Sequence, residues 1–167
     1  MITNYAGILR ALVDAEVQFI LIGGVAANLH GSAQATFDVD VVYSRDKSNI
    51  GRLVKALASS SPYLRGAPPG LPFHFNEATV RHGLNFTLTT TLGDVDLLGE
   101  VAGGGNYEQL LADTVELEAF GIRCKCVTLE RLIQLKRAAG RPKDLQSIAE
   151  LQLLLEKRRK AEPGKPT

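Results

Sequence analysis

Two aspartates stand in an apolar stretch of this chain, where a carboxylate is costly. Asp38 and Asp40 flank Val39 in the run DVDVVY, which predicts a strand buried on both faces. Side chains alternate along a strand, so the two aspartates point to the same side of the sheet. Burial and mutual repulsion disfavour two charged carboxylates there unless something positive neutralises them. A divalent cation would do so, and Mg²⁺ prefers one or two carboxylates completed by water and substrate phosphate.

A glycine pair precedes this strand in the chain. The run VQFILI, residues 17–22, predicts a first buried strand, and Gly23 and Gly24 follow it at the start of a short helix that Gly31 ends. Bare backbone at such a turn can approach a phosphate, and unpaired N–H groups can hold one. A glycine pair alone is also typical of a plain strand-to-helix connection. Followed by the two aspartates, it favours a site that joins phosphate to metal.

A second acid-valine-acid run occurs later in the chain. Asp94 and Asp96 flank Val95 and are followed by two leucines. The run belongs to a predicted antiparallel hairpin formed by residues 85–91 and 94–99. Two such runs in one small domain favour a carboxylate site, with coincidence as the alternative.

Other phosphate-binding patterns do not fit. The sequence contains no G-x-x-x-x-G-K-[ST] run, which excludes a P-loop, and its glycines do not follow the G-x-G-x-x-G spacing of a dinucleotide-binding Rossmann domain. A formal net charge of +1 excludes a strongly basic domain held to nucleic acid by bulk charge. A smaller basic patch remains open, because residues 157–160 (KRRK) could engage RNA phosphates.

The elements that must position these residues form a mixed α/β pattern. The 167 residues, 45% hydrophobic and 22% charged, indicate one globular domain. We expect a mixed sheet flanked by helices, with a parallel unit formed by the two opening strands, antiparallel hairpins later and a C-terminal helical pair. Helices are predicted at about residues 3–15, 48–60, 107–112, 128–139 and 142–160, a second hairpin at 114–120 and 122–127, and a Gly/Pro-rich loop at 61–72. The domain is expected to span residues 1–160, with its core at about 1–127, its helical pair at about 128–160 and a disordered tail at 161–167.

Cysteine content and hydropathy indicate the compartment. The first twenty residues do not resemble a signal peptide, and no apolar run reaches the roughly 18–20 residues that span a bilayer. Cys124 and Cys126 are too few for a disulfide framework, and their spacing in a strand predicts packing on one face. We expect a cytoplasmic protein with no membrane partner. His30, at the end of the first short helix, predicts a packing or hydrogen-bonding role.

The glycine pair, the short helix, the Asp-x-Asp strand and the later strand acid together resemble the DNA polymerase β-type nucleotidyltransferase superfamily. The chain is more closely similar to AbiEii-like and minimal stand-alone bacterial nucleotidyltransferases, which share a segment like GGVAANLHG…T-x-D-x-D and a helical segment like LIQLKRAAGRPKDL. The resemblance covers residues 19–151. It implies a polymerase β-like fold and an enzyme that uses a nucleoside triphosphate as substrate and Mg²⁺ or Mn²⁺ as cofactor.

The resemblance also implies roles for single residues. Asp38, Asp40 and Asp96 would be the catalytic, metal-binding carboxylates, and Asp96 would help to remove the proton of the attacking hydroxyl. Asp94 ranks second to Asp96 because it adjoins the hairpin turn. The nucleotide-binding residues that the resemblance implies are Gly23, Gly24, Thr36, Lys136, Lys143 and Asp144. The alternatives are a solvated helix residue for Lys136 and, for the last two, the opening turn of the final helix.

The implied reaction is attack of an acceptor hydroxyl on the α-phosphate, with release of pyrophosphate. The relatives include toxins of toxin–antitoxin pairs, some of which modify tRNA ends, so the acceptor would be RNA, tRNA or a protein, and a cognate antitoxin the partner. Small antibiotic nucleotidyltransferases are the alternative within this class. Gly24 stands where many members have serine, and Gln34 where the AbiEii-like pattern commonly has arginine. These departures leave open a catalytically silent nucleotide-binding or protein-interaction module, with an RNA-binding scaffold as a third class.

Overall fold

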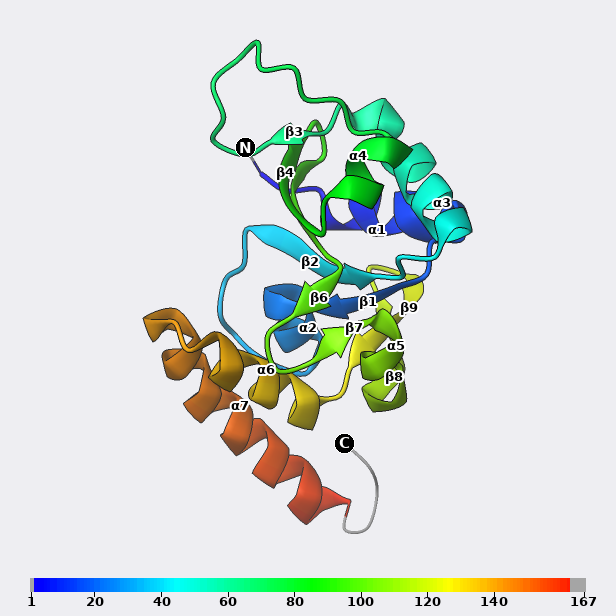
Figure 1. Ribbon diagram of the computed structural model, residues 1–167. Helices are drawn as coiled ribbons and strands as arrows, with labels where there is room; N and C mark the ends of the chain where they lie inside the picture. Colours follow the sequence, from blue (N-terminus) through cyan, green and yellow to red (C-terminus); the bar gives the residue numbers. More distant parts are fainter. Residues whose placement is uncertain (1, 163–167) are drawn as a thin grey trace.

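A mixed sheet with helices on both faces forms the centre of the molecule (Figure 1). The computed structural model describes residues 2–162. Its helices are α1 (Tyr5–Asp14), α2 (Gly23–Leu29), α3 (Lys47–Leu57), α4 (Glu77–His82), α5 (Tyr107–Leu110), α6 (Leu129–Ala139) and α7 (Pro142–Ala161), with 3₁₀ turns at Ala58–Ser60 and Leu111–Asp113. Its strands are β1 (Phe19–Ile22), β2 (Asp38–Tyr43), β3 (Tyr63–Leu64), β4 (Asn85–Thr90), β5 (Gly93–Leu98), β6 (Glu100–Val101), β7 (Gly105–Asn106), β8 (Thr114–Ala119) and β9 (Ile122–Val127). The sheet order is β3-β4-β5-β2-β1-β9-β8, and β6 and β7 form a separate ribbon.

Polar caps and a glycine stop define the ends of the main helices. The side chains of Asn4, Asp46 and Thr128 accept backbone N–H groups at the starts of α1, α3 and α6. Gly140 ends α6 in the left-handed region, with φ of 64°, and Pro142 begins α7 two residues later. The predicted C-terminal helical pair therefore forms with a sharp turn between its members. The predicted disordered tail lies mostly outside the described residues, and α7 reaches Ala161.

The two opening strands are antiparallel, so the predicted parallel unit is wrong. β1 runs against β2, with Ile22 opposite Asp40. Helix α2 has only seven residues, which is about 10 Å of helix, and residues 32–37 then return the chain to the same end of the sheet. The strand that does run parallel to β2 is β5. This pairing brings the two acid-valine-acid runs side by side.

The stretch between α3 and β4 is more structured than the predicted loop at 61–72. Tyr63–Leu64 form β3, which pairs with β4 at the edge of the sheet. A two-residue strand between prolines and glycines is too short to produce a periodic pattern. The short helix α4 and the β6–β7 ribbon escape prediction for the same reason. Between β3 and α4 the chain forms a wide loop that projects beyond the sheet (Figure 1).

Helices bury the central strands from both sides. α1 packs on β2, β9 and α3, whereas α2 packs on β1 and β2 and contacts α6, which in turn packs along α7. Figure 1 shows α1 and α3 above the central strands and α2, α6 and α7 below them. Every side chain of β1 is buried, and in β2 only Asp38 and Asp40 are partly exposed. Cys124 and Cys126 are buried and unpaired, as predicted. Among the helices of residues 2–162, none is both long and apolar enough to cross a membrane.

The buried side chain of His30 connects the end of α2 to β9. Its environment determines how protonation of His30 affects the stability of the protein. It is 4% exposed, its Nε2 donates to the Val127 carbonyl at 2.7 Å, and its buried Nδ1 has no hydrogen-bond partner. Burial lowers the pKa of His30, because protonation would add a second N–H group that no acceptor receives. The folded protein therefore binds this proton less readily than the unfolded chain, whose histidines titrate near pH 6.5.

Because the unfolded chain takes up this proton more readily than the folded protein, we expect His30 to contribute a fall in the free energy of unfolding as the pH drops below about 6.5. Between pH 7.5 and pH 5.5, the melting temperature of the wild-type protein should fall relative to that of His30→Gln. His82→Gln, which alters an exposed histidine, is the matched control and should retain the wild-type pH dependence. Equal slopes for the wild-type protein and His30→Gln would contradict this account of His30.

Candidate active site

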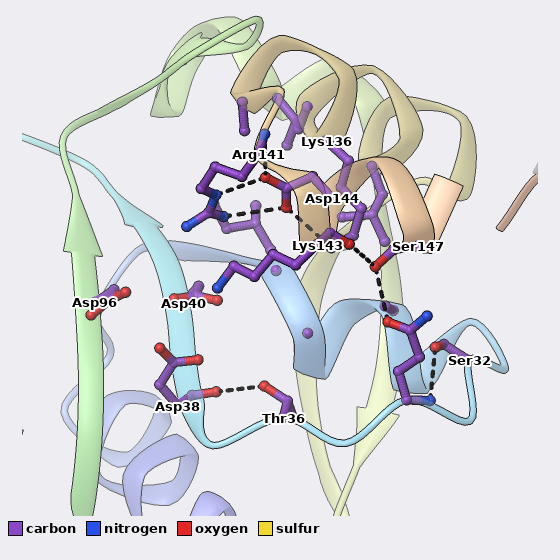
Figure 2. Close-up of a pocket in the computed structure, with 18 of the residues that line it drawn as sticks. Ser32, Thr36, Asp38, Asp40, Asp96, Lys136, Arg141, Lys143, Asp144 and Ser147 are labelled. Atoms are coloured by element: carbon purple, nitrogen blue, oxygen red, sulfur yellow. Dashed lines mark hydrogen bonds and ion pairs between the residues drawn. The ribbon is translucent and has the colours of Figure 1, made fainter. Parts of the chain in front are cut away.

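Four aspartates lie together on the paired strands β2 and β5. The parallel register places Asp38 beside Asp94 and Asp40 beside Asp96, and strand alternation directs all four to one face. One carboxylate oxygen from each of Asp38, Asp40 and Asp96 lies within 4.8 Å of the other two. Figure 2 shows these three residues on neighbouring strands around a common space. The structure thus brings together the three aspartates that the sequence singles out.

Burial and mutual repulsion make the charged forms of these carboxyl groups unfavourable unless a cation is bound. Burial, followed by the charges of Asp38 and Asp96, raises the pKa of Asp40 to about 8. Burial and the charge of Asp96 also raise the pKa of Asp38, against the lowering effects of Arg65 and Lys143. Ionisation is therefore unfavourable in both carboxyl groups, and an added cation would relieve the repulsion. Three partly buried carboxylates supply hard oxygen donors, which fit Mg²⁺ or Mn²⁺.

The aspartates form one wall of a cavity of about 710 Å³ that lies between the sheet and the C-terminal helices. Helices α6 and α7 supply a facing wall, and the start of α2 lies between the two. The cavity lining includes all six residues that the sequence predicts to bind nucleotide: Gly23, Gly24, Thr36, Lys136, Lys143 and Asp144. One concave surface therefore gathers every predicted site residue.

Close packing requires the glycine pair at the start of α2. Gly23 has a φ of +70°, and a Cβ there would lie 2.7 Å from Cγ of Asp40. A Cβ on Gly24 would lie 2.6 Å from Cβ of Thr36, and the Thr36 hydroxyl is closer still. Thr36 therefore fills the space that a side chain at position 24 would need. Glycine at position 24 therefore allows Thr36 to pack against the start of α2.

A group of cations faces the carboxylates from α6 and α7. Asp144 is 2% exposed; it accepts a hydrogen bond from Nε of Arg141 at 2.7 Å and lies 3.9 Å from Nζ of Lys136. Its carboxylate also receives the backbone N–H of Arg141 and so fixes the first turn of α7. Burial lowers the pKa of Lys136. Lys143 extends from the same turn toward the aspartates (Figure 2). Asp144 is thus placed to hold two cations at the cavity wall.

Arg65 is a site residue that the sequence does not reveal. It directly follows β3, and its guanidinium lies 2.8 Å from Asp96, 3.3 Å from Asp94 and 3.6 Å from Asp38. An arginine in a Gly/Pro-rich stretch carries no periodic signal, and only the pairing of β3 with β4 brings it to the aspartates. The role of Arg141 also escapes prediction, although its position three residues before an aspartate at a helix start was a usable signal.

The loop between α2 and β2 is tied to α7. The Oε1 atom of Gln34 accepts a hydrogen bond from Ser147 at 2.9 Å. Glu150 accepts hydrogen bonds from the Ser32 hydroxyl and the Ala33 backbone N–H. Gln34 therefore uses its side-chain amide oxygen to hold the loop against the last helix.

Phe37 contributes to the cavity, whereas the three histidines of the chain do not. Phe37 lines the cavity while 78% exposed, so its ring is free to contact a bound molecule, and sequence reasoning missed it. His74 and His82 are exposed and are not among the described residues that line the cavity. His30 is buried against β9, away from the carboxylates, as its predicted packing role requires.

Comparison with known proteins identifies the fold. No protein-family model matches this sequence, and no curated protein sequence matches it significantly. The lincosamide antibiotic adenylyltransferase LnuA, solved with lincomycin bound, superposes with a TM-score of 0.60 at 14% identity, over 92% of this chain and 99% of that one. A candidate nucleotidyltransferase of Thermotoga maritima gives 0.56 at 14% identity, over 87% and 88%. ANT(2'')-Ia in complex with adenylyl-2''-tobramycin gives 0.52 at 14% identity, over 93% and 95%.

The fold is that of the polymerase β-like nucleotidyltransferases. The predicted fold class is thereby confirmed, including the mixed sheet and the C-terminal helices. At 14% identity the likeness is one of fold, so the closer resemblance to AbiEii-like proteins stays a prediction.

The burial and repulsion that raise the pKa of Asp40 predict a gain in stability when its carboxyl group is replaced by a neutral amide. Asp40→Asn replaces the most deeply buried carboxyl group of the cluster with a neutral group of similar shape. We expect the metal-free variant to unfold with a free energy about 1–2 kcal/mol higher than the wild-type protein at pH 7. Denaturant unfolding in a chelator measures this difference.

The sign follows from the raised pKa of Asp40. Its carboxyl group costs stability above the unfolded pKa of about 3.9, and the cost grows as the pH rises toward 8. The gain should therefore shrink near pH 4. Asp14→Asn, which alters an exposed aspartate of α1, should leave stability unchanged within about 0.5 kcal/mol. A destabilised Asp40→Asn protein at pH 7 would contradict the account.

Proposed function

We propose that this protein is a metal-dependent nucleotidyltransferase that moves a nucleoside monophosphate from a nucleoside triphosphate to a hydroxyl acceptor and releases pyrophosphate. The observation that carries the proposal is the trio of carboxylates on β2 and β5, which faces a cavity lined by a glycine pair and by cations. The likeness of fold to antibiotic adenylyltransferases supports the same class of reaction.

Each carboxylate has a distinct task in this proposal. Asp38 and Asp40 would hold Mg²⁺ or Mn²⁺ against the triphosphate, and Asp96 would join them at the side of the acceptor. The bound metal supplies Lewis acidity at the entering and leaving oxygens. Asp96 would orient the attacking hydroxyl and receive its proton, since a carboxylate within hydrogen-bond reach of a hydroxyl acts as a general base.

The cations of α6 and α7 would bind the triphosphate. Lys143 reaches toward the carboxylates, and Lys136 and Arg141 are fixed by the buried Asp144. A cation that is already held in place loses little freedom when it meets phosphate. Asp144 would act as a positioning residue for these two cations. The backbone of Gly23 and Gly24 and the Thr36 hydroxyl would contact phosphate from the opposite side, the hydroxyl taking the place of the serine that many relatives carry at position 24.

The charge of the cavity bears on the acceptor. Among the described residues that line it, the acids are Asp38, Asp40 and Asp96, which the metal would occupy, and Asp144, which is bound to two cations. No further carboxylate of this lining is left to recognise a polycationic drug. We therefore favour RNA, tRNA or a protein hydroxyl as acceptor, with a small antibiotic hydroxyl as the alternative that the structural neighbours support. A toxin of a toxin–antitoxin pair would act on such a macromolecule.

Labelled nucleoside triphosphates test the proposal directly. The purified protein, with Mg²⁺ or Mn²⁺, is incubated with total RNA, with a protein extract or with a panel of aminoglycosides and lincosamides. We expect label to pass to one of these acceptors, and Asp96→Asn to reduce the rate by at least about a hundredfold. Asp14→Asn is the control and should keep the wild-type rate.

Three outcomes separate the alternatives. Transfer to a drug and raised drug tolerance on expression would support the small-molecule enzyme, whereas transfer to RNA or protein with growth arrest would support the toxin. Nucleotide binding in calorimetry that needs no divalent cation, with no transfer to any acceptor, would overturn the enzyme proposal in favour of a silent binding module.

The packing of Gly24 against Thr36 yields an independent prediction. Gly24→Ser should destabilise the protein by about 1–3 kcal/mol and depress activity, because the new side chain meets Thr36. Adding Thr36→Ala should recover part of both losses, since it frees that space and leaves one hydroxyl at the phosphate side. A double-mutant cycle on unfolding free energy and on KM for the triphosphate measures the coupling. Additive effects of the two substitutions would contradict the packing account.

A further inference from the structure

Arg65 occupies the side of the carboxylate cluster that a metal would use. Its backbone N–H donates to Thr87 on β4, which fixes the residue at the end of β3. From there the guanidinium crosses the sheet face. Its Nη2 donates to the Leu88 carbonyl and to Asp96, each at 2.8 Å, and its Nη1 lies 3.6 Å from Asp38. The arginine that follows the edge strand therefore contacts two of the three carboxylates at the centre of the site.

A divalent cation and this guanidinium compete for the same oxygens. Mg²⁺ binds carboxylate oxygens at 2.0–2.1 Å. A metal that joins Asp38 to Asp96 would therefore lie within a few ångströms of the guanidinium nitrogens, in a partly buried site where like charges repel strongly. The metal and the guanidinium cannot both make close contacts with the same oxygens of Asp38 and Asp96. A metal held by Asp38 and Asp96 would therefore displace the guanidinium.

Asp94 also forms an ion pair with Arg65. Its Oδ2 lies 3.3 Å from Nε of Arg65, and it is the one aspartate of the paired strands that lies outside the metal-binding trio. The register holds Asp94 beside Asp38, and β4 pairs it with Thr89. Asp94 thus forms an ion pair with Nε of Arg65, although that N–H makes no hydrogen bond, and Asp94 is not among the three aspartates that would bind metal. The role of Asp94, the fourth aspartate of the cluster, would be to pair with Arg65.

We propose that Arg65 is an internal counter-ion of the carboxylate cluster, which divalent metal displaces from Asp38 and Asp96 while Asp94 retains it at the edge of the site. The inference rests on the proposed function, because it takes the three carboxylates as the metal site. Arg65 keeps the metal affinity of the free protein low. The negative charge of the triphosphate offsets the remaining repulsion, so metal enters together with the nucleotide.

Mn²⁺ titration followed by electron paramagnetic resonance tests this without reference to turnover. In the absence of nucleotide, Arg65→Met should bind Mn²⁺ at least about tenfold more tightly than the wild-type protein, because the competing charge is gone. Arg65→Lys should fall between the two, since an ammonium keeps the charge but cannot bridge the carboxylates. Arg123→Met removes an exposed arginine paired with Glu116 on the β8–β9 hairpin and should match the wild-type affinity.

Thermal unfolding separates this role from a merely structural one. In a chelator, Arg65→Met should melt below the wild-type protein, because the aspartates lose their counter-ion. Saturating Mn²⁺ should then raise its melting temperature by more than that of the wild-type protein. An equal deficit with and without Mn²⁺ would reduce Arg65 to a structural residue.

The failures of the two proposals are distinguishable. If wild-type protein binds Mn²⁺ and Asp38→Asn abolishes binding, but Arg65→Met binds it no more tightly, the counter-ion proposal is overturned and the metal site stands. If neither the wild-type protein nor Arg65→Met binds Mn²⁺, with or without a triphosphate, both proposals are overturned.

Discussion

The parallel pairing of β2 with β5 is the constraint on which the whole site depends. Each strand carries an acid-valine-acid run, and their register sets acid beside acid and valine beside valine. Val39 and Val95 are fully buried on the opposite face. A slip of one residue would turn carboxylates into this apolar layer, so burial of the valines fixes the register. Hydrophobic packing on one face of the sheet thus holds together, on the other, charges that repel each other.

The counter-charges come from distant parts of the chain. Arg65 reaches the cluster from the edge strand, and Lys143 from the first turn of α7. The turn at Gly140 sets the direction of α7, and the buried Asp144 at its start binds the cations beside it. The site therefore forms only when the sheet and the C-terminal helices are both in place. Its cavity is the space between them.

Strand alternation and turn chemistry made much of this architecture predictable. The bounds of β2 match the run DVDVVY, and α6 (Leu129–Ala139) lies within the predicted helix at 128–139. The direction of β2 was not predictable, because the connection from β1 is long enough for either orientation and tertiary pairing decides between them. The role of Arg65 was not predictable either, because the two-residue strand β3 that precedes it is too short to show a periodic hydrophobic pattern. The packing of Thr36 against Gly24 is visible only once the loop is folded.

The central claim is that three aspartates from two strands form one cation site that faces the triphosphate. Crystals grown with Mn²⁺ and a non-hydrolysable triphosphate analogue test it most directly through anomalous scattering. The account predicts an anomalous peak in contact with Asp38, Asp40 and Asp96 and with the phosphates of the analogue. Analogue bound in the cavity with no anomalous peak beside these carboxylates, or with the manganese bound elsewhere, would contradict it.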